Sequence, residues 1–333
     1  MPLETYRKKK DLSNTRNIKM QEPNRIQEKQ DLENKEVNEW IHFGVRLAFS
    51  SALHPLDYSK TLIQLGYEPI PAKRGKSLLG KEVQILPNVF SYAGHIRNTD
   101  GFFGMYRGLT PKLAGTLISM VFSEKIAEGF GFSEYTPTDD LNEEQLLTQF
   151  KENLKRDLVV EVSGVILAHP FHVISVRMMA QFIGKETFYN SFFGSVAEIY
   201  KDYGIFGFFS GMIPKLMFEV SCLVLSSSTV FLLNKYVIKD KMARQYNSSI
   251  TQFAYASILY PLQVVSTCMT VTGSRLAAGN LPMMPNYNNW RECWNDLQIR
   301  DELKRGSSLF FRTAPIQSIQ KISSKRFAVS KKH

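Results

Sequence analysis

Five long, mostly apolar segments alternate with polar stretches along the chain, and this pattern predicts membrane-spanning helices. The segments cover residues 40–65, 111–132, 158–183, 214–238 and 248–274. The fifth contains no charged residue and meets the length of roughly 18 or more uncharged residues that a membrane span requires. Charged residues interrupt the other four, which taken singly would also fit helices of a soluble bundle.

A proline lies inside the first, third and fifth of these segments and marks a repeat. Pro55, Pro170 and Pro261 stand in the related stretches 54–60, 169–175 and 260–266. Proline in a helix interior removes a backbone donor and clashes with the preceding turn, so each segment should be kinked. Three kinked segments in similar contexts indicate a repeated architecture.

A glycine followed by aromatic residues recurs in the same order and supports the repeat independently. These runs begin at Gly101, Gly204 and Gly306, and each is followed by a proline. Between the kinked segments and the glycines, residues 87–98 and 188–201 have the spacing of short amphipathic helices. Each repeat is therefore predicted to hold a kinked helix, a short amphipathic helix and a second apolar helix.

The third repeat is predicted to be incomplete. After Pro315 the chain continues with residues 316–333, which contain five lysine or arginine residues and are too short and polar to span a membrane. We therefore predict an all-α membrane protein of three degenerate repeats. It would have five transmembrane helices, short amphipathic helices between them, and no sixth helix.

The predicted order of parts follows from these boundaries. It comprises a charged tail (1–37), repeat one (38–132), a polar linker (133–155), repeat two (156–240), an incomplete repeat three (246–315) and a basic tail (316–333). The N-terminal tail mixes both charge signs, so it cannot bury enough apolar surface to offset its ordering entropy and is expected to be disordered. It also has no apolar run of the kind found in a secretory signal.

Composition narrows the chemistry and the partners. The formal net charge is +10, and basic loops flank the apolar segments, which suits anionic lipid head groups better than nucleic acid. The three cysteines have no metal-like spacing and imply no disulfide framework. His169 and His172 are spaced to share a metal, but no third ligand is indicated, and packing is favoured. No nucleophile–base arrangement is evident, so we expect neither an enzyme nor a cofactor.

Several of these stretches resemble the mitochondrial carrier family. Its repeat combines a proline, an acid and a base, here Pro55, Asp57 and Lys60, with a glycine-bounded run, here residues 100–108. The chain is more closely similar to the mitochondrial carrier homolog subfamily, in the stretches 63–69, 90–96, 169–174, 181–184 and 305–312. The resemblance covers about 44–315 and implies a degenerate mitochondrial carrier fold.

The resemblance also implies a function. It implies a multi-pass protein of the mitochondrial outer membrane that inserts α-helical proteins, tail-anchored ones included, into that membrane. The expected partners are hydrophobic α-helical client proteins and membrane lipids, with no nucleic acid. Docking of the pro-apoptotic protein Bid and lipid scrambling are implied as well, which leaves a receptor or scramblase as an alternative. A solute carrier is a further alternative from a different class.

The charges of the kinked segments argue against transport by alternating access. In a carrier, the acid and base of each repeat contribute to a ring of ion pairs that closes one gate. The three repeats hold, in turn, Asp57 with Lys60, His172 with Ser175, and Gln263 with Ser266. Only the first repeat retains both charges, so an ion-pair ring cannot close.

A missing sixth helix would leave the first and fifth helices bordering a polar groove that opens sideways to lipid. Polar faces inside a membrane line water or protein rather than acyl chains. Such a groove would let the polar flank of a client cross while its apolar helix enters the lipid. The residues predicted to line the groove are Arg46, Asp57, Lys60, Glu161, His172, Arg177, Glu219, Tyr260 and Gln263.

Two of these residues have simpler interpretations that the sequence leaves open. Lys60 would form an ordinary intrahelical pair with Asp57, and Glu219 would pair with Lys215, four residues earlier. The orientation of the spans is open as well, because basic loops occur on both sides of the predicted spans.

Overall fold

The computed structural model describes residues 40–76, 80, 82–132, 142–238 and 240–314, which belong to two compact units. The first unit contributes residues 40–53, of which 40–52 form one helix. The second unit begins at His54 and holds all the other described elements. The predicted tails, residues 1–37 and 316–333, lie outside the described residues, as does the stretch 133–141 of the predicted linker.

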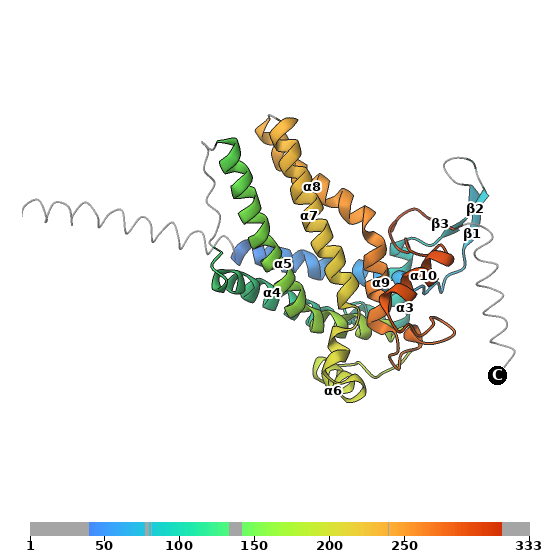
Figure 1. The fold of residues 1–333 in the computed structure, drawn as a ribbon. Coiled ribbons are helices and arrows are strands. Elements are labelled where there is room, and N and C mark those ends of the chain that lie inside the picture. The colour runs from blue at the N-terminus through green and yellow to red at the C-terminus, as the bar shows by residue number, and fades with distance from the viewer. Residues whose placement is uncertain (1–39, 77–79, 81, 133–141, 239, 315–333) are drawn as a thin grey trace, which may run out of the picture. The chain divides into compact units, whose positions relative to one another are not determined.

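Helices dominate the second unit and follow the predicted order (Figure 1). Repeat one contains α2 (His54–Gln64), α3 (Val89–Gly104) and α4 (Leu109–Gly129). Repeat two contains α5 (Glu143–Ala180), α6 (Phe192–Tyr203), the 3-10 helix η1 (Ile205–Phe209) and α7 (Met212–Tyr236). Repeat three contains α8 (Lys241–Ile258), α9 (Tyr260–Val271), the 3-10 helix η2 (Ala277–Gly279) and α10 (Trp290–Ile299). The predicted apolar segments and both predicted amphipathic helices are thus helical.

Two of the three prolines coincide with breaks in the helices. The helix of residues 40–52 ends in a turn at residue 53, and α2 begins directly before Pro55. α8 and α9 meet at Leu259 with a bend of 58°, and Pro261 lies in the first turn of α9, where its missing donor costs nothing. The 58° bend confirms the predicted kink of the fifth segment, and the kink of the first segment stays a prediction. α5 instead continues through Pro170 as one helix.

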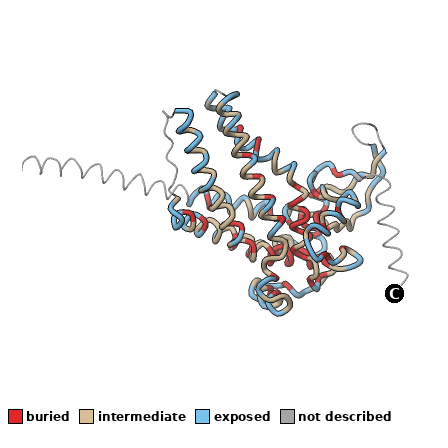
Figure 2. Tube along the Cα trace, in the orientation of Figure 1, coloured by how far each residue is buried: buried red, intermediate tan, exposed pale blue. Residues whose placement is uncertain are grey.

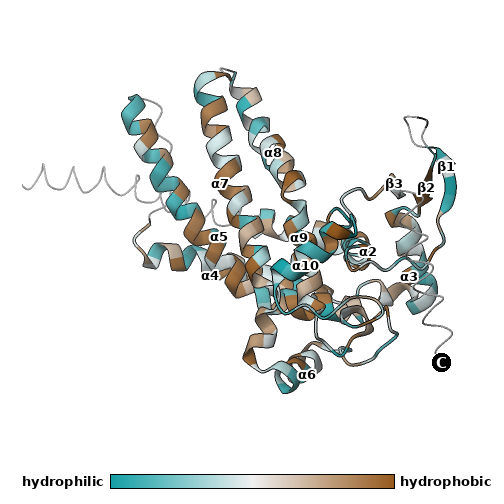
Figure 3. Cartoon of the chain, turned by 45° about the vertical axis from the view of Figure 1, so that its right-hand side comes forward, coloured by the Kyte–Doolittle hydropathy of each residue, from teal (hydrophilic) through white to brown (hydrophobic). Residues whose placement is uncertain are grey.

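Two helical stretches in the described chain are long and apolar enough to cross a membrane. They are α5 and residues Ile205–Tyr236, and the bent pair of α8 and α9 would make a third. Figure 3 shows that α7 is mostly hydrophobic, whereas α5 becomes hydrophobic only beyond its polar beginning. α4 is less apolar because Lys112, Glu124, Lys125 and Glu128 lie within its 21 residues. Five transmembrane helices therefore remain a prediction.

α5 begins earlier than the sequence predicted. Residues 143–155 of the predicted linker are helical, and α5 extends over 38 residues. Asn142 and Gln145 form a capping box, and two glutamates in the first turn suit the positive end of the helix dipole. The apolar spacing locates only the membrane-compatible part of this helix, which is why the predicted start was too late.

A three-stranded antiparallel sheet corrects the all-α prediction. β1 (Lys73–Lys76) pairs with β2 (Glu82–Leu86), and β2 pairs with β3 (Arg312–Ala314). β1 and β2 belong to repeat one, whereas β3 lies at the end of repeat three. Strands this short carry little periodicity, and the pairing of β2 with β3 joins residues far apart in the sequence, so hydrophobic patterning did not predict the sheet.

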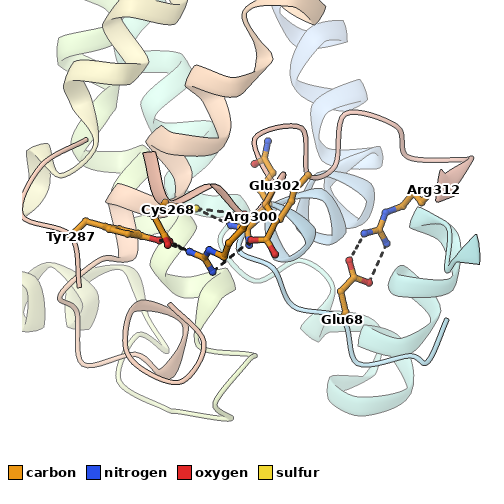
Figure 4. Close-up of polar contacts among 9 residues, drawn as sticks. Glu68, Cys268, Tyr287, Arg300, Glu302 and Arg312 are labelled. Carbon is orange, nitrogen blue, oxygen red and sulfur yellow. Dashed lines mark hydrogen bonds and ion pairs between the residues drawn. The ribbon is translucent and has the colours of Figure 1, made fainter. Parts of the chain in front are cut away.

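The end of repeat three also contacts repeat one through a backbone hydrogen bond and an ion pair. The backbone N–H of Val89 donates to the carbonyl of Leu309 at 2.9 Å. The Arg312 guanidinium pairs with the Glu68 carboxylate, as Figure 4 shows, and its carbon lies 5.3 Å from the centroid of the Tyr92 ring. Burial, together with the Glu68 carboxylate, raises the pKa of the Tyr92 phenol. Repeats one and three are therefore in direct contact here.

The structure corrects the alignment of the third glycine landmark. The residue before each proline donates to a backbone carbonyl: His54 to Arg107 at 3.0 Å, His169 to Ser210 at 2.9 Å, and Tyr260 to Arg305 at 2.8 Å. The residues that follow these carbonyls are Gly108, Gly211 and Gly306, all with positive φ. Gly306 therefore corresponds to Gly108 and Gly211, and not to the earlier glycines with which the sequence aligned it.

The corrected alignment shows what repeat three holds. α10 takes the place of the amphipathic helices α3 and α6, and the sequence signal for it is the spacing of Trp290, Cys293 and Leu297, of which the last two are buried. α4 and α7 begin directly after their glycines, whereas the chain after Gly306 is not helical and leads to β3. Within the described residues up to 314, no sixth long helix begins.

The buried core lies where α2, α5 and α9 meet, and Figure 2 shows the buried positions gathered there. Two equivalent hydrogen bonds join the repeats at this level. Ser175 donates to the Gly108 carbonyl at 2.7 Å, and Ser266 donates to the Gly211 carbonyl at 2.9 Å. Each serine stands where the carrier pattern has a base, so the joints between repeats are neutral.

Candidate functional site

A cavity of about 230 Å³ lies between α4, α5 and α7. Three of the predicted groove residues line it: Glu161 and His172 on α5, and Glu219 on α7. The other lining residues are Ser119, Ser123, Val160, Gly164, Val165, Ala168, His169 and Lys215. Because α5 and α7 contain the two apolar candidate spans, the cavity places charged side chains within membrane-compatible helices. We call it the Glu161 cavity.

Lys215 and Glu219 form an ion pair across one turn of α7. The Lys215 Nζ lies 3.0 Å from the Glu219 carboxylate, and about a quarter of each side chain is exposed. This contact confirms the simpler interpretation of Glu219, in which an acid pairs with the base four residues before it. Both charges still line the cavity, so the pair also contributes to its polarity.

Glu161 supplies the other carboxylate of the cavity. It makes no hydrogen bond or ion pair with any residue that the structure describes, although the charges of Glu219 and Lys215 act on it. Its side chain is half-buried. An ionisable side chain that lies in a membrane-compatible helix without a direct partner is a functional candidate by default.

The two histidines of the cavity are held by packing and by the backbone. The His169 Nε2 donates to the Ser210 carbonyl at 2.9 Å, and the His169 and His172 rings lie with their centroids 5.8 Å apart. Across the described chain, no group of three or more His, Cys, Asp or Glu side chains is placed to hold a metal. Gly164 allows α4 to approach α5 here, because a Cβ at this position would come within 2.7 Å of the Ser119 hydroxyl.

Asp57 and Lys60 have partners on other helices. Asp57 pairs with Lys112 on α4 at 2.5 Å. The Lys60 Nζ lies 5.3 Å from the centroid of the Tyr260 ring on α9. The direct intrahelical pair that the sequence left open is therefore not what the structure shows, and neither residue lines the Glu161 cavity.

α2 and α9 are joined directly at Gln64. The Gln64 Nε2 donates to the Tyr260 hydroxyl at 2.9 Å, and Thr267 donates to the Gln64 Oε1 at 3.1 Å. The sideways opening that we predicted between the first and fifth helices is thus closed at this level, because Gln64 bridges the two helices. For the rest of those two helices, the opening remains a prediction.

The remaining predicted groove residues are not among those that line the Glu161 cavity. Arg177 is buried in the core, where its Nε donates to the Thr270 carbonyl at 3.1 Å and its guanidinium carbon lies 4.9 Å from the centroid of the Tyr203 ring. Gln263 is half-buried on α9. Arg46 is exposed on the helix of residues 40–52, in the first unit. These placements indicate a packing role for Arg177.

Four polar residues of the cavity were not among the predicted groove residues: Ser119, Ser123, His169 and Lys215. Ser119 and Ser123 are four residues apart and share a face of α4, and His169 lies one turn before His172 on α5. This spacing was the available signal. It was insufficient because small hydroxyl residues in apolar helices also serve helix packing.

With the fold and the cavity established, comparison with known proteins identifies the class. A family model described as mitochondrial carrier protein matches residues 46–130 and 158–241. The chain belongs to the mitochondrial carrier family. It is 36% identical over 273 residues to mitochondrial carrier homolog 2 of Homo sapiens, which covers 78% of this chain and 89% of that protein.

Two further relatives place the chain within the family. Mitochondrial carrier homolog 1 of Mus musculus is 31% identical over 309 residues, covering 84% of this chain and 78% of that protein. Solute carrier family 25 member 33 of Danio rerio is more distant, at 25% identity over 183 residues, 54% of this chain and 53% of that protein. The family and the apolar helices together indicate a mitochondrial membrane protein.

Proposed function

We propose that this protein inserts α-helical membrane proteins, tail-anchored ones included, into the mitochondrial outer membrane. The observation that carries the proposal is the Glu161 cavity, in which α5 and α7, both apolar enough to span a membrane, present two carboxylates and an ammonium group. A charged group at the centre of a bilayer costs about 2.5–3.5 kcal/mol on insertion scales. A polar path through the protein lowers this barrier for the polar flank of a client, without nucleotide hydrolysis.

The neutral joints between repeats support insertion over solute transport. Ser175 and Ser266 bond to glycine carbonyls where a carrier gate would need charged bases. A gate that opens and closes by exchanging ion pairs has no counterpart at these positions. Bid docking and lipid scrambling, which the resemblance also implies, are compatible with the same fold.

The decisive experiment uses the purified full chain in liposomes. A tail-anchored client is presented to liposomes with and without the protein, and its protease-protected fraction is measured. We expect protection to depend on the protein. Equal protection in empty liposomes would refute insertase activity, and a labelled phospholipid in the same liposomes reports scrambling separately.

The number of spans gives a topology prediction. Five spans place the region after Ser274 and the C-terminus at His333 on the same side of the membrane, because no span lies between them. Epitope tags after Ser274 and at His333, combined with protease protection in intact mitochondria, measure this. Tags on opposite sides would mean that a sixth span follows residue 314.

Charge reversal at Glu219 tests the cavity directly. We expect Glu219→Arg to change client insertion by about tenfold or more, because it puts a second positive charge beside Lys215 in a poorly hydrated site. Glu152→Arg is the matched control, since Glu152 is exposed on α5 and pairs only with Lys155. Insertion per folded molecule is the measurement. If Glu219→Arg lowers protein level and insertion in equal proportion, Glu219 is structural.

A further inference from the structure

The polar groups of the Glu161 cavity are mostly acceptors. The carboxylates of Glu161 and Glu219 line it together with one ammonium group, that of Lys215. Lys215 is already paired with Glu219 at 3.0 Å, whereas Glu161 has no hydrogen-bond or ion-pair partner in the described chain. When both imidazoles are neutral, the lining holds two carboxylates and one ammonium group. The ammonium of Lys215 neutralises Glu219, so the remaining negative charge is that of Glu161.

His169 adds a second, independent acceptor. Its Nε2 faces the Ser210 carbonyl at 2.9 Å, so that nitrogen carries the hydrogen, and the Nδ1 of the neutral ring is an acceptor. The Nδ1 is buried and has no partner among the described residues, although His169 lines the cavity. This nitrogen exposes almost no surface, as does the Nδ1 of the equivalent His54, so its lone pair adds to the polarity of the cavity wall without contacting a bound group.

We infer that the Glu161 cavity binds the cationic nitrogen of a basic side chain, a lysine or arginine next to the apolar helix of a client. This inference rests on the proposed insertase function, because a client supplies the side chain. An ammonium or guanidinium group brings positive charge for the Glu161 carboxylate and N–H donors for its two oxygens. A cavity of about 230 Å³ accommodates the head of one such side chain but not a folded segment.

The charge preference of the cavity is measurable without any client. Ser119→Cys places a thiol in the lining, where its reaction with three methanethiosulfonates is timed in detergent: one with a primary ammonium, one with a quaternary ammonium, and one with a sulfonate. Each rate is divided by that of a free thiol. The native cysteines are all buried, and the chain without Ser119→Cys gives their background rate.

We expect the primary ammonium reagent to react about tenfold faster than the sulfonate reagent, because the Glu161 charge attracts one and repels the other. Adding Glu161→Gln should remove most of this preference with little change in shape. Glu152→Gln, on the exposed part of the same helix, should leave it unchanged. The inference is overturned if the ammonium and sulfonate reagents react at nearly equal rates, or if Glu161→Gln leaves the ratio of their rates unchanged. Equal rates for both ammonium reagents also overturn it, in favour of a quaternary lipid head group.

A client-insertion experiment tests the cation site and the insertase function separately. Two tail-anchored clients that differ only in a lysine or a glutamine beside the apolar helix are inserted into liposomes by wild type and by Glu161→Gln. We expect wild type to favour the lysine client severalfold and the variant to lose that preference. Insertion without preference overturns the cation site but not the insertase. A charge-selective cavity in a protein that inserts neither client overturns the insertase and leaves the cation site with another ligand.

Discussion

Replacing Gly211 with alanine is expected to destabilise the protein by about 3 kcal/mol or more, the largest stability loss we predict for a single methyl group. Gly211 has a φ of 76°, which costs an alanine about 1–2 kcal/mol. A Cβ there would also lie 2.5 Å from the Ser266 carbonyl oxygen and 2.9 Å from the Thr270 hydroxyl oxygen. The carbonyl belongs to the buried α9 backbone, so it cannot move without opening the joint.

Gly131→Ala is the matched control for this prediction. Gly131 also has a positive φ, of 84°, but a Cβ there would meet nothing within 4 Å. It should therefore cost only the backbone strain of about 1–2 kcal/mol. Thermal unfolding of both variants in the same detergent measures the difference. Equal losses would show that the contact between repeats two and three at Gly211 contributes nothing to stability.

A similarly close approach occurs at the glycines that correspond to Gly211 in the other two repeats. A Cβ at Gly108 would lie 2.8 Å from the Ser175 carbonyl oxygen, and one at Gly306 would lie 3.0 Å from the Tyr260 hydroxyl and 3.3 Å from Ile63. Gly108 and Gly211 thus let a backbone turn pack against the backbone of α5 and α9, and Gly306 lets a turn pack against side chains of α2 and α9. Repeat three makes this joint even though no sixth long helix follows its glycine within the described residues.

Local periodicity predicted those parts of the fold that depend on neighbouring residues. The apolar segments, the two short amphipathic helices and the break near Pro261 are all present, because each follows from spacing or from a missing backbone donor. The pair of Lys215 and Glu219 was open to prediction for the same reason, since four residues make one helical turn.

Contacts between distant residues were not predictable in this way. Asp57 pairs with Lys112, 55 residues later, rather than with Lys60 on its own helix. The pairing of β2 with β3 likewise depends on how the repeats close, which no local pattern encodes. The alignment of Gly306 was wrong for a related reason: repeat three has Asp301 at a positive φ shortly before it, where the other repeats have glycine.

Among the predicted site residues, local sequence features likewise predicted some placements and missed others. Glu161, His172 and Glu219 were chosen as polar residues in apolar helices, and the structure brings them to one cavity. The same criterion also selected Arg177, but this side chain is buried in the core, where it donates to the Thr270 carbonyl and stacks on the Tyr203 ring. A charge in an apolar helix indicates that some partner exists, and only the tertiary arrangement shows whether that partner is the core or a cavity.

Lys60→Glu is expected to change which clients are inserted. The Asp57 carboxylate pairs with Lys112, so it does not neutralise Lys60 by direct contact. The Lys60 ammonium instead faces the Tyr260 ring and is close enough to Lys215 to interact with it electrostatically. Lys60 is therefore a fixed positive charge that repels basic client flanks. Reversing it should favour basic-tailed over acidic-tailed clients by about tenfold, the effect of roughly 1.4 kcal/mol in a partly dry site.

Lys60→Gln separates the charge from the packing. Both substitutions lose the contact with the Tyr260 ring, worth roughly 1–2 kcal/mol at a partly buried site, but only the glutamate reverses the charge. Insertion of matched clients that differ in tail charge alone should thus shift in graded steps from lysine to glutamine to glutamate. If both variants scale every client by one common factor, the ring contact accounts for the whole effect. The client preference would then have to come from other charges, such as that of Glu161.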